Sequence, residues 1–213
     1  MRIKMKYIGN KVEELKIAYI GGGSRGWAWG LMSDLATAGD LSGDVYLYDI
    51  DFEAAKANEK IGNIYNTLEG TKSKWTYHAV KTPKEALTGA NFVVISILPG
   101  TFDEMESDVH TPEKYGIYQS VGDPTGPGGI VRAMRTIPMF EVIANYIKEY
   151  CPDAWVINYT NPMAMLCGAM QKYANVEVTG ENFVDATAVP GRKTSIVVDN
   201  SLPSGSDRIT TLA

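Results

Sequence analysis

Residues 16–26 read KIAYIGGGSRG, an apolar run that leads into glycines spaced as G-x-G-x-x-G. The run predicts a buried strand, and the glycines predict a turn between that strand and a following helix. In this pattern Gly21 permits the tight turn, Gly23 lets the backbone approach a pyrophosphate, and Gly26 lets the helix pack close to the strand. A helix N-terminus also presents free N–H groups to phosphate. The stretch therefore predicts a dinucleotide site that includes Gly21, Gly23, Ser24 and Gly26.

An acidic residue completes the pattern. A second strand over residues 45–48 is followed by Asp49, 28 residues after Gly21. At the tip of the second strand a carboxylate can accept hydrogen bonds from the adenosine ribose, and it repels a 2′-phosphate. We therefore expect NAD rather than NADP. The alternative is that Asp49 and Asp51 only cap a helix beginning near Phe52, a role that suits Asp51 better.

Strand and helix patterns alternate along most of the chain, which predicts an α/β fold with a doubly wound, mostly parallel sheet. Residues 1–180 are expected to form this NAD-binding, Rossmann-like domain. Residues 181–213 are rich in Ser, Thr, Gly, Pro and Asp, with one strand-like run at 195–198, and are expected to be a polar tail or a remnant of a substrate domain. The expected helices are 27–38, 52–68, 131–150 and 162–173, and the further strands are 75–80, 91–98, 154–158 and 176–179.

Two segments after the later strands are candidates for ligand contact, because folds of this type bind ligands at the carboxyl ends of their strands. A loop over residues 99–129 begins at Pro99, which is expected to lie beside the cofactor. The glycines and prolines near Asp123 lead into a helix, and they indicate either a site for an anion or sugar hydroxyl or simply a helix entry. Asn161, before Pro162, fits a helix N-cap, and its amide could also face the ligand.

The remaining ionisable residues form no recognisable catalytic set. His78 lies in a predicted strand and is interpreted as structural, whereas His110 in the long loop could touch a ligand or have no function. The acids at 103, 104, 106 and 108 are expected to form a solvated face. No Ser-His-Asp order and no metal-spaced His and Cys set emerges. Cys151 and Cys167 are in no C-x-x-C pattern and are expected to be buried, idle thiols.

Bulk properties exclude several classes of partner. The 213 residues carry a formal net charge of −5, which gives no electrostatic footprint for nucleic acid or an anionic membrane surface. The first residues lack the apolar core of a signal peptide, and no later run approaches the length that spans a bilayer. We therefore expect a cytoplasmic protein.

Seven short motifs follow one another along the chain: IGGGS (20–24), YDID (48–51), KYG (114–116), GD (122–123), GGI (128–130), RTIP (135–138) and NYTNPM (158–163). In this order they resemble glycoside hydrolase family four, the NAD- and metal-dependent glycosidases that also look like lactate and malate dehydrogenases in their nucleotide half. The resemblance covers residues 16–180. It favours enzymes acting on unphosphorylated α-galactosides or α-uronides, because the Gly122-Asp123 pair is present and a phosphate-sugar loop is absent.

The resemblance implies a hydrolysis that passes through a transient oxidation. In the family, bound NAD⁺ takes hydride from C3 of the sugar, a base removes the C2 proton, and a divalent metal such as Mn²⁺ polarises the oxygens. The aglycone leaves, water adds and the hydride returns. Asp123 and Asn161 match positions that contact the sugar, with Asn161 near a hydroxyl at C3.

The chain also departs from the family pattern. Members continue after the last strand with a glycine and a Cys-His pair for metal and substrate, whereas here Gly180 is followed by ENF (181–183). A later metal-binding histidine and a tyrosine-type base would lie in a substrate domain that is not found in this chain, so no metal ligands are expected in it.

Three hypotheses follow. The first is a family-four-like α-glycosidase, truncated or completed by another chain, and the second is a non-catalytic half-enzyme that binds NAD. The third, less favoured, is a lactate- or malate-like dehydrogenase, for which no catalytic His with an Asp partner is found. A homo-oligomer is expected, because a half-enzyme exposes apolar surface.

Overall fold

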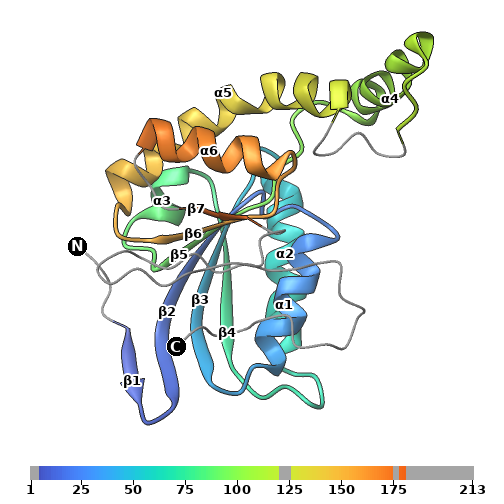
Figure 1. Cartoon of the computed structure of the whole chain (residues 1–213). Coiled ribbons are helices and arrows are strands. Elements are labelled where there is room, and N and C mark those ends of the chain that lie inside the picture. The colour runs from blue at the N-terminus through green and yellow to red at the C-terminus, as the bar shows by residue number, and fades with distance from the viewer. Residues whose placement is uncertain (1–4, 120–125, 175–177, 181–213) are drawn as a thin grey trace. The chain divides into compact units, whose positions relative to one another are not determined.

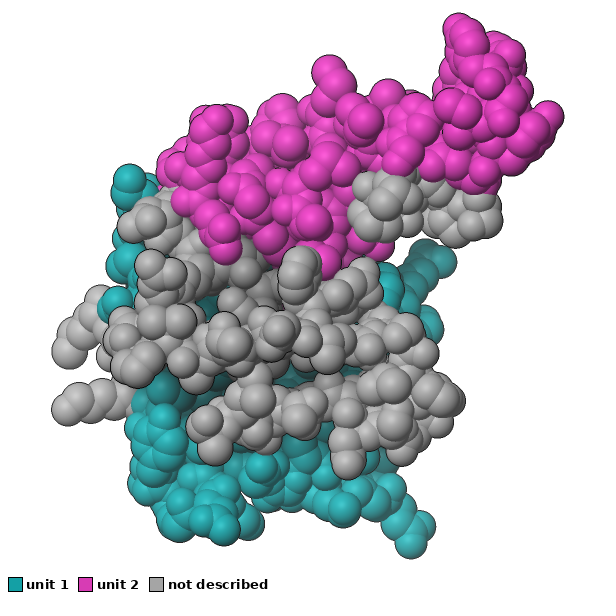
Figure 2. Space-filling view, in the orientation of Figure 1, with its two compact units in different colours: residues 1–97, 146–156 teal, residues 98–145, 157–213 magenta. Residues whose placement is uncertain are grey.

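The computed structural model describes residues 5–119, 126–174 and 178–180 (Figure 1). Contacts divide the chain into two compact units, coloured separately in Figure 2. The first unit comprises residues 1–97 and 146–156, and the second comprises residues 98–145 and 157–213. The predicted boundary at residue 180 stays a prediction, and the strand-like run at 195–198 lies outside the described residues.

Parallel strands form the centre of the first unit. β2 (Lys11–Ile20) pairs in parallel with β3 (Leu41–Tyr48) on one side and with β5 (Phe92–Ile95) on the other. β3 also pairs in parallel with β4 (Trp75–Val80), while the short β1 (Lys6–Ile8) is antiparallel to β2. With β6 (Trp155–Asn158) and β7 (Val178–Gly180), the sheet order is β4-β3-β2-β5-β6-β7. The predicted mostly parallel α/β sheet is confirmed.

Three helices of the first unit cover its strands. α1 (Trp27–Thr37) packs against α2 (Phe52–Tyr65), and α2 lies on β3 and β4, whereas α3 (Pro83–Leu87) contacts β2, β3 and β4 (Figure 1). The approach of α2 is close, because a Cβ added to Gly62 would lie 2.5 Å from the ring of Tyr77. The last six residues of β2 are all buried, and the four that follow Lys16 are the uninterrupted apolar run of the sequence.

Helices dominate the described part of the second unit. The prediction of a loop over residues 99–129 is wrong, because this segment contains α4 (Phe102–His110), a 3₁₀ helix η1 (Thr111–Tyr115) and the start of α5 (Gly126–Tyr150). The side chains of Thr101 and Glu104 form a capping box that starts α4. The same signature begins α3 at Thr82 and Glu85. α6 (Met163–Ala174) follows β6.

The expected solvated acidic face at 103–108 is also wrong at one position. The side chain of Asp108 is only 8% exposed, and it accepts hydrogen bonds from both terminal nitrogens of Arg135, at 2.9 and 3.0 Å. Arg135 comes from α5, so this bidentate ion pair fixes α4 against α5 within the second unit. The partner lies 27 residues away in the sequence, which is why the local acidic pattern did not reveal it.

Candidate functional site

The glycine loop leaves β2 through a turn that is tied to β3. The N–H groups of Gly21 and Gly22 both donate to the carbonyl oxygen of Tyr48, each at 2.9 Å, and the Ser24 N–H donates to the Gly21 carbonyl at 3.0 Å. Gly21 has φ +93°, and a Cβ there would lie 1.8 Å from the carbonyl oxygen of Ser96. The tight turn predicted at Gly21 is therefore confirmed, since a side chain fits neither its backbone conformation nor its surroundings.

The other glycines of the loop differ in what they contact. A Cβ on Gly22 would lie 2.7 Å from Leu47, and one on Gly23 would lie 2.8 Å from the Cβ of Ala54. Around Gly26, which precedes α1, a Cβ would meet nothing within 4 Å. The prediction that Gly26 permits close helix packing is wrong, because Gly22 and Gly23 make the close approaches, to β3 and to α2.

Asp49 connects the glycine loop to the start of α2. Its Oδ2 accepts a hydrogen bond from the Gly23 N–H at 2.8 Å, and its Oδ1 accepts one from the Asp51 N–H at 2.9 Å. The carboxylate of Asp51 accepts from the Ala54 N–H at 3.1 Å, which confirms the capping role predicted for Asp51. Each oxygen of a carboxylate has a second lone pair, so Asp49 retains acceptor capacity for ribose hydroxyls. Its contact with ribose stays a prediction.

Asn58 on α2 is a residue of this site that the sequence analysis missed. Its side chain is buried, and its Nδ2 donates to the carbonyl oxygens of Gly22 and Ser24 at 2.8 and 2.9 Å. Its Oδ1 accepts from the indole Nε1–H of Trp29, on α1, at 2.8 Å. The detectable signal was a polar residue between Ala55 and Gly62 in the buried stripe of α2.

Asn161 lies in the second unit, after the carboxyl end of β6. Its Oδ1 accepts a hydrogen bond from the Met163 N–H at 3.2 Å, which confirms the predicted capping of the following helix, although α6 begins one residue later than expected. The turn before it is shaped by the buried Asn158, whose side chain bonds both the N–H and the carbonyl of Thr160, at 2.8 and 3.0 Å. The Asn161–Pro162 peptide bond is cis.

Two other predicted site residues have different outcomes. Pro99 is a buried residue of the second unit, and its contact with a cofactor stays a prediction. Asp123 falls in 120–125, outside the described residues. Gly21, Gly23, Ser24 and Asp49 are therefore the predicted residues that the structure brings together.

Both histidines have acidic partners. The His78 ring stacks on Tyr46, and its Nε2 lies 2.7 Å from Oδ1 of Asp44, so its predicted structural role is confirmed. Nδ1 of His110, at the end of α4, lies 2.7 Å from Oε1 of Glu113.

Both cysteines are buried, as predicted, and neither takes part in a disulfide bond. Burial raises the pKa of the Cys167 thiol, against the opposing effect of its hydrogen bond with Asn158. Within the described ranges, no three His, Cys, Asp or Glu side chains gather in a group that could hold a metal ion. No helix in the part of the chain that the structure describes is long and apolar enough to cross a membrane.

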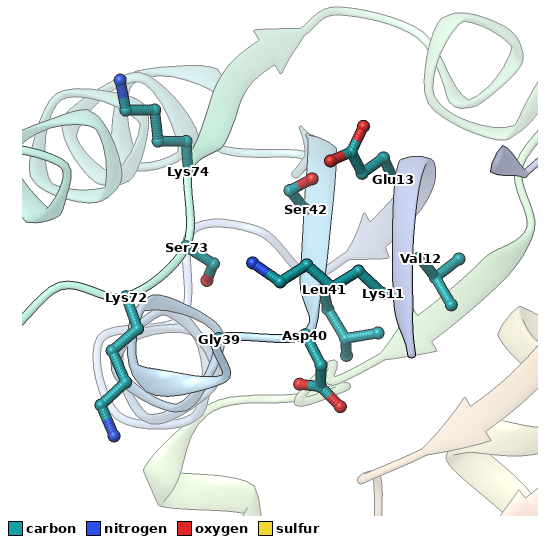
Figure 3. Close-up of a pocket in the computed structure, with 10 residues that line it drawn as sticks. All are labelled: Lys11, Val12, Glu13, Gly39, Asp40, Leu41, Ser42, Lys72, Ser73 and Lys74. Atoms are coloured by element: carbon teal, nitrogen blue, oxygen red, sulfur yellow. The ribbon is translucent and has the colours of Figure 1, made fainter. Parts of the chain in front are cut away.

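A hollow at the other end of the sheet is a poor candidate for the cofactor site. It is lined by the start of β2 and β3 and by the segments just before β3 and β4 (Figure 3). The glycine loop instead follows the end of β2. The lining carries both charges, with the acids Glu13 and Asp40 among its lysines, and the side chains of Lys72 and Lys74 point away from Lys11. The lining of this hollow therefore does not favour a negatively charged cofactor.

Comparisons with known proteins point to one family. The model of the family described as Family 4 glycosyl hydrolase matches residues 16–181. An α-galacturonidase from Thermoanaerobacter italicus is 70% identical over 161 residues, which cover 76% of this chain and 34% of that protein. The crystal structure of lplD from Bacillus subtilis is similar at 54% identity and a TM-score of 0.72, over 79% of this chain and 38% of lplD.

A further structure contains the expected cofactors. The 6-phospho-β-glucosidase of Thermotoga maritima, solved with manganese, NAD⁺ and glucose-6-phosphate, is similar at 25% identity and a TM-score of 0.66, over 78% of this chain and 39% of that protein. The chain spans about a third of the length of the curated α-galacturonidases that it matches.

Proposed function

Because this chain belongs to family 4 of the glycosyl hydrolases, we propose that it forms the NAD-binding part of an enzyme that hydrolyses α-galacturonides. The observation that carries the proposal is the strand, glycine loop and helix arrangement in which Asp49 holds the Gly23 N–H at 2.8 Å. The α-galacturonidase relative supports the choice of substrate class through its 70% identity.

The residues of the glycine loop fit a dinucleotide. Gly21, Gly22 and Gly23 leave no room for side chains on the faces that meet the sheet and α2, so the loop is compact and its backbone can approach a ligand. The N-terminus of α1 follows directly and favours the negative charge of a pyrophosphate. Asp49 would accept the ribose hydroxyls and disfavour a 2′-phosphate. When bound, NAD⁺ supplies the acceptor for a hydride from the sugar.

The sugar contacts are proposed for the second unit. The Oδ1 of Asn161 already accepts a backbone hydrogen bond, which holds the side chain in place and leaves its Nδ2–H groups as donors for a sugar hydroxyl. We assign Asp123 to the same task, as the family pattern implies. The described residues offer no group of ligands for Mn²⁺, so the proposal assigns none of them to the metal.

A second candidate is a chain that binds NAD without hydrolysing a glycoside. It is favoured by one feature of the sequence: Gly180 is followed by ENF (181–183), where the family pattern has a Cys-His pair for metal and substrate. Both candidates share the cofactor site and differ in turnover.

One experiment separates them. The purified chain is titrated with NAD⁺ and NADP⁺ by calorimetry and then incubated with NAD⁺, Mn²⁺, a reductant and nitrophenyl α-galacturonide. Binding of NAD⁺ with turnover supports the first candidate, and binding without turnover supports the second. Absence of NAD⁺ binding refutes both.

A matched pair of variants tests the assigned role of Asp49. Asp49→Asn removes the charge that repels a 2′-phosphate, so the preference for NAD⁺ over NADP⁺ is expected to fall at least about tenfold. Asp51→Asn is the control, because asparagine is also a good N-cap and this side chain caps α2. An equal preference for NAD⁺ over NADP⁺ in the two variants would show that Asp49 does not contact the adenosine ribose.

A further inference from the structure

We propose that Asn58 is a positioning residue for the cofactor: it holds the glycine loop in the conformation that receives the pyrophosphate, and so sets the affinity for NAD without touching it. The inference rests on the proposed NAD binding. It concerns a buried side chain of α2 that lies outside the glycine pattern and 32 residues after Gly26.

The amide of Asn58 fixes the orientation of two peptide units in the loop. Its Nδ2 donates to the carbonyl oxygens of Gly22 and Ser24, at 2.8 and 2.9 Å. In a trans peptide unit the C=O of one residue and the N–H of the next point in opposite directions. The N–H groups of Gly23 and Arg25 are therefore directed away from Asn58.

These two N–H groups have different tasks. The Gly23 N–H is held by the carboxylate of Asp49. The Arg25 N–H comes just before the first turn of α1, the place at which a helix N-terminus of this fold binds pyrophosphate. By holding the Ser24 carbonyl, Asn58 thus aims the Arg25 N–H toward the side on which the ligand is proposed to bind.

The orientation of the Asn58 amide is itself determined. Its Oδ1 accepts the indole Nε1–H of Trp29 at 2.8 Å, while its Nδ2 faces two carbonyl oxygens. A flipped amide would place its oxygen against both carbonyls and its NH₂ against an N–H donor. Because Trp29 lies in the first turns of α1, these hydrogen bonds connect α2, the glycine loop and α1. The connection does not require the cofactor, so we infer that the loop is ordered before the cofactor binds.

Asn63 supplies a matched control on the same helix. Its Nδ2 donates to the carbonyl of Tyr77 at 3.0 Å, and its Oδ1 accepts from the N–H of the same residue at 3.1 Å. An Asp in place of either asparagine keeps the acceptor and loses the donor, because a carboxylate carries no N–H. Asn58→Asp and Asn63→Asp therefore make the same chemical change, at the glycine loop and at β4.

The experiment compares the full 213-residue chain with Asn58→Asp and Asn63→Asp. NAD⁺ affinity is measured by calorimetry, stability by urea unfolding, and amide hydrogen exchange of residues 21–26 without cofactor. We expect the dissociation constant of Asn58→Asp to rise by about tenfold or more and that of Asn63→Asp by less than about twofold, although both variants are less stable. Exchange in residues 21–26 is expected to be faster in Asn58→Asp alone.

Equal NAD⁺ affinities and equal loop exchange in the two variants would overturn the proposal. If the wild-type chain fails to bind NAD⁺, the proposed function falls, and the exchange comparison alone decides whether Asn58 orders the loop. If Asn58→Asp does not fold, Trp29→Phe decides: this substitution at a side chain that is partly exposed removes the N–H that orients the amide. A weakened NAD⁺ affinity and faster loop exchange support the role of Asn58, and unchanged values of both overturn it.

Discussion

Two glycines of the same G-x-G-x-x-G pattern should respond in opposite ways to alanine. Gly21 has φ +93°, and a Cβ there would lie 1.8 Å from the Ser96 carbonyl oxygen. Gly26 has φ −91°, and a Cβ there would meet nothing within 4 Å. Gly21→Ala is therefore expected to destabilise the chain severely, whereas Gly26→Ala should leave its stability almost unchanged.

The magnitudes follow from these geometries. An L-residue held in a sparsely populated backbone region costs about 1–3 kcal/mol. The Ser96 carbonyl would also have to move by more than about 1 Å, and such overpacking costs about 1–3 kcal/mol more. Gly21→Ala should thus lower the free energy of unfolding by about 2–6 kcal/mol. At Gly26 the lower entropy of the unfolded chain and the slightly poorer cap nearly offset each other, so the change should stay below about 1 kcal/mol.

Urea unfolding followed by far-ultraviolet circular dichroism measures both variants in the absence of cofactor. Circular dichroism is preferred to fluorescence because Trp27 and Trp29 lie next to the mutated loop. Comparable losses of stability in the two variants would refute the reasoning, because they would mean that the spacing pattern, and not the contacts of each glycine, determines the cost. A stable Gly21→Ala variant would refute the described turn itself.

Three further predictions concern contacts outside the glycine loop. Hydrogen bonds from Thr82 lower the pKa of Glu85. The ionised Glu85 therefore stabilises the fold above its usual pKa, and this stabilisation is lost as the pH falls through the lowered pKa. Glu85→Gln should make the acid unfolding curve, followed by circular dichroism, less steep. Arg135→Met leaves the nearly buried Asp108 carboxylate without its bidentate partner and should lower the free energy of unfolding in urea by about 2 kcal/mol. Most of this loss should be recovered in the double variant that also carries Asp108→Leu. Asn158→Ala removes two hydrogen bonds to the backbone of Thr160 and should lower the free energy of unfolding by about 2 kcal/mol. The loss should appear as a lower midpoint of thermal unfolding.

The sequence predicted the sheet well because its signals are local. The apolar end of β2, the capping box at Thr82 and the acid after β3 each lie within a few residues of the element that they specify. The same kind of signal is present at Thr101 and Glu104, within the residues 99–129 for which a loop was predicted. The loop prediction was therefore wrong although the capping box can be recognised in the sequence.

The candidate site was less predictable, because its contacts join residues that are distant in the sequence. Gly26 completes the spacing of the pattern, yet Gly22 makes the close approach to Leu47. The carboxylate of Asp49 holds the Gly23 N–H, 26 residues away, a contact that neither the predicted ribose contact nor the alternative capping role includes.

Asn58 illustrates the same limit, since the carbonyls that it binds are 34 and 36 residues earlier in the chain. A spacing pattern marks where the loop lies in the sequence. It does not record which side chains hold that loop in place. A buried polar residue in an otherwise small and apolar helix stripe is the signal to look for, because burial of an amide is costly unless each of its polar atoms has a partner. For Asn58 those partners are the carbonyls of the glycine loop and the indole of Trp29. Asking which groups bond the buried Asn58 amide therefore identifies the contact that orders the proposed cofactor site.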